Sequence, residues 1–386
     1  MPPTRLLHIA TVPETLYFLR GQIQFMRRAG FEVHVATSPG SRLQRFAEQW
    51  EVPTHELPLT RSISPAEDIV AVRAARALIR SIAPDIVHGH TPKGGLVAML
   101  AAAAARVRVR VYHLRGMPLL TATGATRAAL WGAEATSMSC AHRVIAVSHS
   151  LAASTRALHL PAGDKLTVIG AGSSNGVDLT RFDPSAGTRD AARRRLGLDP
   201  DSTLFGFVGR MVADKGIPEL VEAWSRVTSD GASAKARLLL VGTYEERDGL
   251  DESTRHRIES CATIEHRPFA EDVVSVYRAL DALILPTRRE GFPNVPLEAA
   301  AMGLPVVTTD AVGAIDSVLH DVTGLIVPTG DVGRLADAIA RYLAQPALRH
   351  AHGQAGRARV ERHFRPETIW EGVLDVYRRE LARRNS

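Results

Sequence analysis

The chain has 386 residues, of which 45% are hydrophobic and 23% are charged, a composition typical of a globular protein and not of a disordered or fibrous one. This length exceeds one ordinary hydrophobic core and therefore favours two domains. Two cysteines, Cys140 and Cys261, are too few for a disulfide framework, so we expect a reducing compartment.

The net charge of +6 is unevenly distributed along the chain. Residues 1–180 hold 19 Lys and Arg against 11 Asp and Glu, whereas the remainder holds 28 against 30. A basic first half indicates an anionic partner, such as a membrane surface or a phosphorylated substrate, or else arginines that only solvate helix faces. Nucleic acid is not expected, because the basic residues are not interleaved with aromatic ones.

No segment has the pattern of a signal peptide or a membrane span. The first apolar run is interrupted by His8 and soon followed by Glu14, which excludes a signal-peptide core. The longest apolar run, residues 94–105, is short, rich in alanine and bounded by Lys93 and Arg106. It is too short to cross a bilayer, and we expect a cytoplasmic protein.

Short β-rich runs alternate with helical patterns through the first 150 residues. The run at 16–29 has apolar residues at the helical period and stops at Gly30, a residue that suits a helix end. The predicted strands are 6–11, 31–37, 85–88, 107–114 and 143–147, and the predicted helices are 16–29, 68–82 and 125–141.

A second series of the same kind follows the Gly- and Ser-rich stretch at 170–176, which is the best linker candidate. This βαβα order predicts two doubly wound α/β domains with parallel sheets and a ligand cleft between them at the carboxyl ends of the strands. The predicted strands are 204–208, 237–241, 282–285 and 305–309, and the predicted helices are 218–227, 272–279, 296–302, 331–343 and 367–383.

The connection after the strand at 204–208 carries two cations. The segment "FVGRMVADKG" turns at Gly209 and places Arg210 and Lys215 before a helix. Arginine can bind two oxygens of a diphosphate and lysine can act as a point charge. On spacing alone, the alternative that both are ordinary exposed loop residues is favoured.

Two glutamates, Glu290 and Glu298, flank the start of the predicted helix at 296–302. We expect Val295 and Pro296 to be its N-cap and first residue, which places Glu298 near the third position, where a carboxylate favours the helix dipole. This accounts for Glu298 as a capping residue but leaves Glu290, in the preceding loop, unexplained. A helix start there also offers free N–H groups to a phosphate.

The spacing of these two glutamates resembles the Glu-x7-Glu motif of family-four retaining glycosyltransferases with the GT-B fold. "EGFPNVPLEAAAMGLPVVTTD", "VGRMVADKG", "NGVDLTRF" and "TGLIVPTGD" also occur in that family's order. "TVPETLYFLRGQI", "DIVHGHTPKGG" and "PLLTATG" resemble the subgroup that builds capsular polysaccharide, exopolysaccharide and O-antigen units. The resemblance implies an acceptor-binding domain, residues 1–172, joined by a C-terminal helix at 366–386, and a sugar-nucleotide domain, residues 173–365.

The resemblance also implies roles for the residues of the second domain. Arg210 and Lys215 would hold the diphosphate of the donor, Glu290 would contact hydroxyls of its sugar, and Glu298 would contact the ribose. Amides of residues 292–295 would meet sugar and phosphate, and the segment at 265–267 would read the base through its backbone. The implied donor-binding residues are Gly209, Arg267, Gly291, Phe292, Pro293, Asn294, Val295 and Glu298, with Arg210, Lys215 and Glu290 as catalytic residues.

On the acceptor side, the family's histidine-glycine pair is replaced here by Arg115-Gly116. Either Arg115 contacts the donor or His113 reaches in, although His113 is first expected to be a strand histidine bonded to backbone. We expect His88 and His90 to alternate across the end of their strand, so that only one faces the ligand, and not to bind metal. Besides Arg115 and His113, the acceptor-side candidates are Glu14, Thr15, His90 and Lys93.

The implied reaction moves a hexose or N-acetylhexosamine from a nucleotide diphosphate sugar, UDP-linked by expectation, to a hydroxyl of a glycan or polyprenyl-diphosphate-linked acceptor. It retains configuration and gives an α-linkage by same-face attack, with no metal or other cofactor. The basic first domain would contact the inner face of the membrane peripherally. Open alternatives are a soluble natural-product acceptor and a sugar-nucleotide epimerase or hydrolase on the same scaffold.

Overall fold

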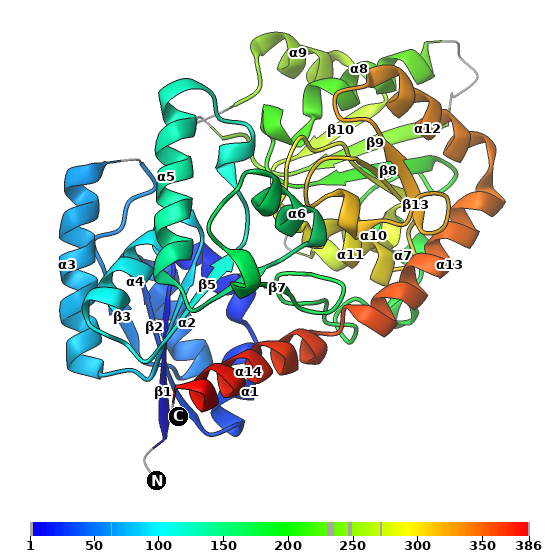
Figure 1. Ribbon diagram of the computed structural model, residues 1–386. Helices are drawn as coiled ribbons and strands as arrows, with labels where there is room; N and C mark the ends of the chain where they lie inside the picture. The colour runs from blue at the N-terminus through cyan, green and yellow to red at the C-terminus, as the bar shows by residue number, and fades with distance from the viewer. Residues whose placement is uncertain (1–2, 63, 230–234, 246–248, 271, 385–386) are drawn as a thin grey trace. The chain divides into compact units, whose positions relative to one another are not determined.

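The computed structural model describes residues 3–62, 64–229, 235–245, 249–270 and 272–384. The chain divides into two compact units: residues 1–176 with 366–386, and residues 177–365. Each unit is a parallel sheet covered by helices (Figure 1), the doubly wound arrangement expected from the alternation of strands and helices.

The first unit contains a seven-stranded parallel sheet in the order β3-β2-β1-β4-β5-β6-β7. Buried Val, Leu and Ile fill its strands because helices cover both faces. The strands are β1 (Thr4–Ile9), β2 (Phe31–Thr37), β3 (Thr54–Glu56), β4 (Ile86–His90), β5 (Val109–Leu114), β6 (Arg143–Ala146) and β7 (Leu166–Val168).

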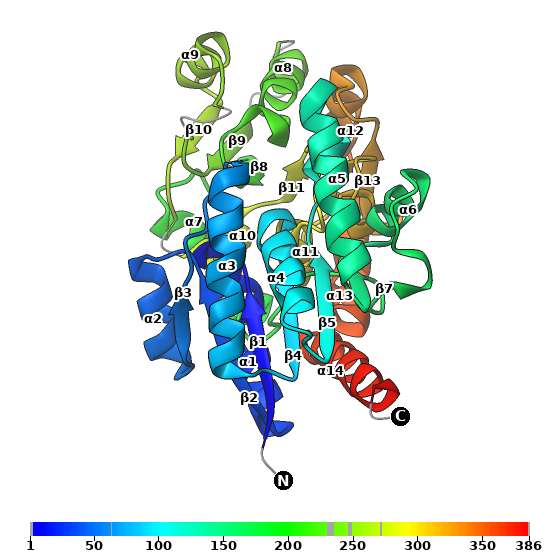
Figure 2. The same ribbon diagram turned by 60° about the vertical axis from the view of Figure 1, so that its left-hand side comes forward.

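Three helices of the first unit, α3, α4 and α5, lie side by side over one face of its sheet (Figure 2). On the other face, apolar residues of α1 and α14 share one core with β1, β2, β4 and β5. The helices are η1 (Pro13–Leu19), α1 (Gln22–Arg28), α2 (Ser41–Trp50), α3 (Pro65–Ile82), α4 (Pro92–Ala104), η2 (Pro118–Leu120), α5 (Gly124–Cys140), α6 (His149–Ala157), η3 (Gly163–Lys165) and α14 (Pro366–Arg383).

The predicted helix at 16–29 is wrong in one respect, because the structure splits it into η1 and α1. The break falls at Gly21, whose φ of +74° suits glycine. A Cβ there would lie 2.5 Å from the Trp370 ring. The first segment is a 3-10 helix, and α1 begins only at Gln22.

The second unit contains a six-stranded parallel sheet in the order β10-β9-β8-β11-β12-β13. Its core packs α8 and α12 against the sheet, with Trp224 and Tyr342 fully buried. The strands are β8 (Thr203–Val208), β9 (Ala236–Val241), β10 (Ile264–Arg267), β11 (Ala282–Leu285), β12 (Val306–Thr309) and β13 (Gly324–Val327).

The helices of the second unit flank its sheet on both faces (Figure 1). The helix α13 was not predicted: it has no apolar stripe and packs closely on α11, where a Cβ on Gly353 would lie 2.0 Å from the Gly303 carbonyl oxygen. The helices are η4 (Pro184–Ala186), α7 (Arg189–Arg195), η5 (Ala213–Lys215), α8 (Ile217–Thr228), α9 (Glu252–Ser260), α10 (Val273–Ala279), α11 (Asn294–Ala301), η6 (Ile315–Ser317), α12 (Val332–Ala344) and α13 (Pro346–His363).

Candidate functional site

The sheet of the second unit reverses its strand order between β8 and β11. In doubly wound folds this switch point, at the carboxyl ends of the strands, is where ligands bind. The loop after β8 carries Gly209, Arg210 and Lys215, and the loop after β11 carries Glu290 and Gly291. The fold therefore brings the predicted cationic loop and the predicted glutamate loop to one place.

Three contacts tie these two loops together. Lys215 Nζ forms an ion pair with Glu290 Oε1, and both side chains are largely buried, with 18% and 13% exposed. One residue earlier in each loop, Asp214 Oδ2 accepts from Arg289 Nη2 at 2.9 Å. Gly216 lies so close to β11 that a Cβ would be 1.9 Å from the Pro286 carbonyl oxygen. The loops thus form one rigid surface.

Arg210 lies at the same edge but is held differently. Its Nη1 atom donates to Glu245 Oε2 at 2.9 Å, and its side chain is 58% exposed. An exposed pair of this kind contributes little to stability. Arg210 can consequently change partner at little cost, whereas Lys215 is held by a largely buried carboxylate.

The helix after the second loop begins earlier than predicted. Pro293 is the N-cap of α11 and Asn294 its first residue, so Val295 and Pro296 lie inside the first turn. The predicted position of Glu298 near the third residue is therefore wrong; it is the fifth. Proline did not mark the first residue, because every N–H in the first turn lacks an intrahelical partner and proline is tolerated throughout it.

The start of α11 has no side-chain cap and no acidic residue in its first turn. Its N–H groups are therefore available to an anion. Phe292 is buried and packs on the Phe364 ring, with 5.7 Å between centroids. Gly291 lies against the loop after β12, where a Cβ on Gly313 would be 2.4 Å from its carbonyl oxygen. These contacts fix the loop that leads into the helix.

Glu298 is largely buried. It is 9% exposed, and its Oε2 atom accepts from the Tyr277 hydroxyl at 2.8 Å. Tyr277 could not be predicted as part of the site, because nothing in the sequence connects α10 to α11. The two residues form a buried polar contact directly behind the start of α11.

Two other residues predicted to bind the sugar nucleotide, Gly209 and Arg267, make hydrogen bonds through their backbone. Gly209 donates its N–H to Val241 at 2.9 Å, and the Arg267 carbonyl accepts from Gly242 at 2.9 Å. The Arg267 side chain is engaged with Glu265 and with the Leu196 carbonyl oxygen, 2.6 Å away. Its guanidinium is thereby committed to neighbouring residues.

The first unit has its own switch point, between β1 and β4. Thr11 follows β1 and Thr91 follows β4, and their hydroxyl oxygens are 2.7 Å apart. Thr91 has φ +68° and ψ 159°, a region that residues other than glycine rarely adopt and that is associated with functional sites. The sequence analysis missed both threonines, since local backbone strain leaves no composition signal.

The polar acceptor-side candidates near this switch point are held by other residues. Lys93 Nζ lies 2.7 Å from Asp68 Oδ1 and 3.0 Å from Thr60 Oγ1, which ties α4 to α3. Glu14 is exposed and pairs with Arg42 at 3.2 Å and with Arg61 at 3.5 Å. Thr15 is buried. Lys93 therefore has a structural role in this state of the protein.

The histidine candidates belong to a buried cluster that the sequence analysis did not anticipate. His88 and His90 lie on the same side of β4, with ring centroids 4.2 Å apart. The expectation that they face opposite ways is wrong, because residues two apart on a strand share a face. His8 of β1 and His113 of β5 complete the cluster, and all four side chains are at most 1% exposed.

His113 stacks on His88 with ring centroids 5.2 Å apart, and neither of its ring nitrogens has a hydrogen-bond partner in the described part of the chain. The expectation of a backbone-bonded histidine is therefore wrong. Arg115 instead contacts the cluster, since its Nε atom donates to His90 Nδ1 at 3.1 Å and its Nη1 atom to the Ser174 carbonyl at 3.0 Å.

Burial keeps the cluster neutral. It lowers the pKa of His8 to about 3, with the charge of Arg115 as a second cause, and lowers the pKa of His88, His90 and His113 well below the usual value. Burial also lowers the pKa of Arg115 to about 9, so the guanidinium stays charged at neutral pH.

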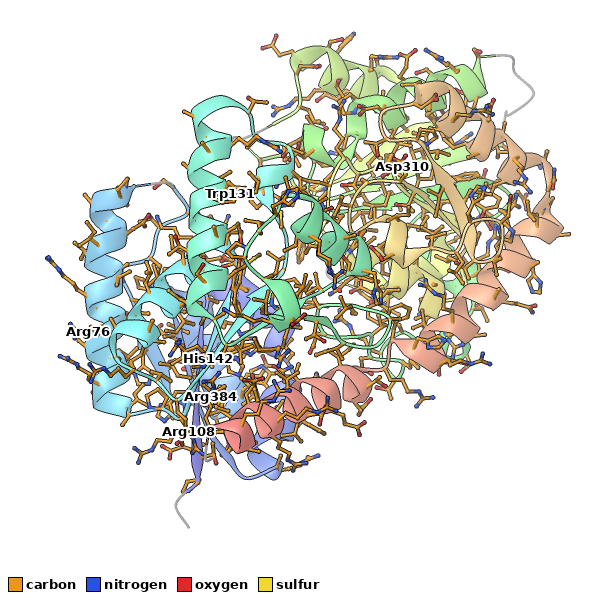
Figure 3. All side chains as sticks on the ribbon, in the orientation of Figure 1. Arg76, Arg108, Trp131, His142, Asp310 and Arg384 are labelled. Atoms are coloured by element: carbon orange, nitrogen blue, oxygen red, sulfur yellow. The ribbon has the colours of Figure 1, made fainter. Side chains whose placement is uncertain are left out.

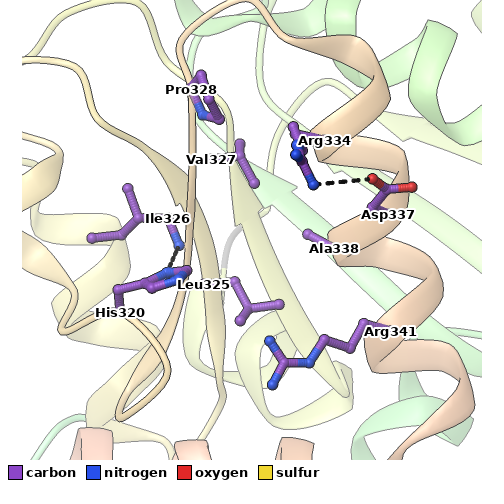
Figure 4. Close-up of a pocket in the computed structure, with 9 residues that line it drawn as sticks. All are labelled: His320, Leu325, Ile326, Val327, Pro328, Arg334, Asp337, Ala338 and Arg341. Carbon is purple, nitrogen blue, oxygen red and sulfur yellow. Dashed lines mark hydrogen bonds and ion pairs between the residues drawn. The ribbon is translucent and has the colours of Figure 1, made fainter.

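A separate cavity of about 370 Å³ opens beside the edge strand β13 (Figure 4). None of the residues predicted to act on a donor or an acceptor lines it. It is bounded by His320, Leu325, Ile326, Val327, Pro328, Arg334, Asp337, Ala338 and Arg341.

Comparison with known proteins gives a consistent result over both units. Residues 18–181 match the family model described as Glycosyltransferase Family 4, and residues 202–345 match the model described as Glycosyl transferases group 1. The capsular polysaccharide biosynthesis glycosyltransferase CapM of Staphylococcus aureus is 34% identical over 377 residues, which cover 98% of this chain and 97% of CapM.

Two solved structures share the fold over almost the whole chain. Sucrose-phosphate synthase from Thermosynechococcus elongatus has a TM-score of 0.79 at 23% identity and covers 98% of this chain and 99% of its own. Anabaena Alr3699/HepE in complex with UDP has a TM-score of 0.79 at 20% identity, covering 97% and 99%. At these identities the likeness shows the GT-B fold alone.

Proposed function

This chain belongs to glycosyltransferase family four, and from that premise we propose that it transfers a hexose or N-acetylhexosamine from a UDP-linked sugar to a hydroxyl of a glycan or lipid-linked acceptor. The reaction retains configuration and forms an α-linkage. The similarity to CapM supports a place in bacterial polysaccharide biosynthesis.

The ion pair between Lys215 and Glu290 is the observation that carries this proposal. It joins the two loops that meet at the switch point of the second unit, where a doubly wound sheet binds its ligand. A lysine suits the departing phosphate, and a carboxylate suits the hydroxyls of a sugar. One contact thus brings together the two kinds of group that a sugar diphosphate requires.

We assign the donor as follows. Arg210 and Lys215 hold the diphosphate and neutralise its charge as it departs. Glu290 accepts from hydroxyls of the sugar, Glu298 holds the ribose, and the first amides of α11 meet the phosphate. The backbone near Arg267 reads the base. This assignment uses Arg210, whose exposed pair with Glu245 is easily exchanged.

These residues also account for a reaction without a metal ion. Two cationic side chains and the uncapped start of α11 supply positive charge where the leaving diphosphate develops negative charge. The departing phosphate oxygen takes the proton of the acceptor hydroxyl as the new glycosidic bond forms on the same face. No nucleophilic carboxylate is required.

For the acceptor, we propose that the first unit binds a phosphorylated lipid carrier at the inner face of the cell membrane. Basic side chains are spread over several of its elements, and Figure 3 shows Arg76 on α3 with Arg108 and Arg384 further down the unit. Such cations favour an anionic surface by about 1 kcal/mol each. No helix in the described part of the chain is long and apolar enough to cross a membrane.

Donor binding can be measured by thermal denaturation with a panel of uridine, guanosine and adenosine diphosphate sugars. A ligand that binds the folded state raises the unfolding midpoint by mass action. We expect a rise with uridine diphosphate sugars for the wild type and for the exposed control Lys235→Met, and a much smaller one for Lys215→Met. No rise with any nucleotide sugar would overturn the donor assignment.

Transfer is separated from hydrolysis and epimerisation by following UDP release. Transfer predicts release that depends on an added acceptor, such as a polyprenyl diphosphate sugar in detergent. Release without an acceptor would identify a hydrolase, and conversion of the donor sugar without UDP release would identify an epimerase. A soluble hydroxylated acceptor in a parallel reaction tests the alternative acceptor class.

A further inference from the structure

Three histidines at the carboxyl ends of β1 and β4 have the spacing of a metal site. His8, His88 and His90 each offer one ring nitrogen, and these three atoms lie within 4.8 Å of one another. All three side chains are buried. Neutral imidazole is a common ligand of zinc and other transition metals. Their hydrogen bonds decide whether any of these nitrogens has a lone pair to offer.

The tautomer of His90 is set by Arg115. A guanidinium can only donate hydrogen bonds, so His90 Nδ1, 3.1 Å from Arg115 Nε, must be the unprotonated nitrogen. The proton of the neutral ring is therefore on Nε2. This Nε2–H faces His8 Nδ1 at 2.9 Å and donates to it, which places the proton of His8 on its own Nε2. Arg115 thus fixes the tautomer of His90 directly and that of His8 through His90.

The tautomer of His88 is set by Tyr377 on α14. The tyrosine oxygen lies 2.5 Å from His88 Nδ1, and it has no other hydrogen-bond partner among the described residues. If the hydroxyl donates to the imidazole, one buried donor, the His88 Nε2–H, is left unpaired; if the imidazole donated instead, both the tyrosine hydrogen and the Nε2 lone pair would be unpaired. His88 therefore also carries its proton on Nε2.

We propose that Arg115 and Tyr377 keep this histidine cluster free of metal by fixing all three tautomers. In each ring the lone pair is on Nδ1 and already faces a donor: Arg115, His90 or Tyr377. A metal ion needs a lone pair from every ligand, so binding would require the donors to turn away from Nδ1 and, in any ring that bound through Nε2, the proton to move to Nδ1. The charge of Arg115 opposes a cation as well.

This assignment makes the cluster a hydrogen-bonded chain and not a coordination site. A series of hydrogen bonds runs from Arg115 through His90 to His8 across the switch point of the first unit. Arg115 sets the direction in which these hydrogen bonds are donated. Arg115 and Tyr377 are therefore positioning residues: they act through the imidazoles and not on a ligand. The four rings are buried, and the strained Thr91 directly follows His90.

The tautomers can be measured by nitrogen-15 NMR of the histidine side chains in the full-length protein. We expect the wild type to show the Nε2–H form for His8, His88 and His90. Arg115→Met should release His90 and His8 while leaving His88 unchanged, and Tyr377→Phe should release His88 alone. Arg127→Met, which removes another arginine of the same unit, should change none of the three.

Cobalt titration provides the second measurement, read from the visible absorption of the bound ion. We expect Arg115→Met to bind Co²⁺ about 100-fold more tightly than the wild type, a change of the size that outer-shell partners of metal ligands produce. Adding His88→Gln to Arg115→Met should abolish that binding. Arg115→Lys, which retains charge and donor, should behave as wild type and remains informative if the methionine variant does not fold.

Three results would overturn the proposal. One is a wild-type ring among the three that carries its proton on Nδ1. Another is stoichiometric cobalt binding by the wild type that His88→Gln removes, which would show an ordinary metal site. The third is a folded Arg115→Met protein with unchanged tautomers or unchanged cobalt affinity.

Discussion

At the scale of single residues, the candidate donor site is a set of charges that already have partners. Lys215 pairs with Glu290, Arg289 with Asp214, and Arg210 with Glu245. The first two pairs are partly buried and hold the two loops together, whereas the third is exposed. Lys215 and Glu290 hold the loops together and are also proposed to contact the donor, so substitutions there need a measure of folding beside the measure of activity.

Glu290→Gln should lower kcat/KM for sugar transfer by about 100- to 1000-fold, the range observed when one group that stabilises developing charge is removed. The amide preserves the shape of the side chain but cannot form an ion pair with Lys215. Activity is compared with that of Glu252→Gln, an exposed glutamate of the same unit, and the unfolding midpoint is measured for both. Near-normal transfer by a folded Glu290→Gln would show that the donor site is elsewhere.

Gly216→Ala tests the close approach at the switch point. Gly216 has φ +74°, and a Cβ would lie 1.9 Å from the Pro286 carbonyl oxygen. We expect a loss of about 3 kcal/mol in the free energy of unfolding, from backbone strain and steric overlap together.

Gly303→Ala is the matched control for that clash. Gly303 has φ +77°, but a Cβ there would meet no atom within 4 Å, so only the strain of about 1 kcal/mol should remain. Urea denaturation of the two variants separates the effects. Equal losses of unfolding free energy in the two variants would show that the overlap with Pro286 does not destabilise the protein.

At the scale of elements, α5 and β5 of the first unit share a buried acid. Glu134 on α5 accepts from the Tyr112 hydroxyl at 2.8 Å, and burial raises the pKa of Glu134 to about 7. Gly95 on α4 makes room for the same tyrosine, since a Cβ there would lie 2.1 Å from its ring. The contact thus links a strand to two of the helices that cover it.

This acid should make stability depend on pH. The folded state holds the Glu134 proton up to about pH 7, whereas the unfolded chain releases it near 4.5. The unfolding free energy therefore falls as pH rises between these values, by about 3 kcal/mol, and is level above them. Glu134→Gln should remove this dependence in urea denaturation at pH 5 and pH 8. An unchanged slope would show that another group titrates.

Strands were easier to predict from the sequence than helix ends and contacts. β2 and β11 have the predicted bounds, because each is a short alternating or apolar run that turn residues bound on both sides. The start of α11 was misplaced because proline is compatible with any first-turn position. The split at Gly21 depends on Trp370, which is distant in sequence, and no local pattern records such a contact.

Those parts of the candidate site that lie together in one segment of the sequence could be predicted. The loops after β8 and β11 are each contiguous, so their chemistry is visible in sequence, and the family resemblance relates them. The histidine cluster was misjudged because its parts lie on three strands and on α14. Tyr377 and His88 are 289 positions apart, and only the fold brings them together.

At the scale of the whole molecule, the chain completes its first unit with its last helix. Pro366–Ser386 belongs to the same compact unit as residues 1–176, and Val373 and Tyr377 of α14 are fully buried in that unit's core. The second unit consists of one continuous segment, residues 177–365. The stability of the first unit therefore depends on residues from both ends of the sequence.

Deleting residues 366–386 should destabilise the first unit selectively. Loss of several buried side chains costs several kcal/mol, which corresponds to about 10 °C or more in the unfolding midpoint of a unit of this size. Differential scanning calorimetry should show one transition lowered and the other unchanged. Arg379→Ala, which removes an exposed ion pair with Asp375 on α14, should leave the temperatures of both transitions unchanged. A deletion that lowers only the second unit's transition would contradict this division.

The ion pair between Lys215 and Glu290 has a further consequence for turnover. In the proposed reaction an incoming donor competes with Glu290 for the lysine, and part of its binding free energy is spent on that exchange. When the sugar has left, the carboxylate can return to the lysine and displace the diphosphate. Competition from Glu290 weakens inhibition by the nucleotide diphosphate product. The enzyme would therefore continue to turn over as this product accumulates.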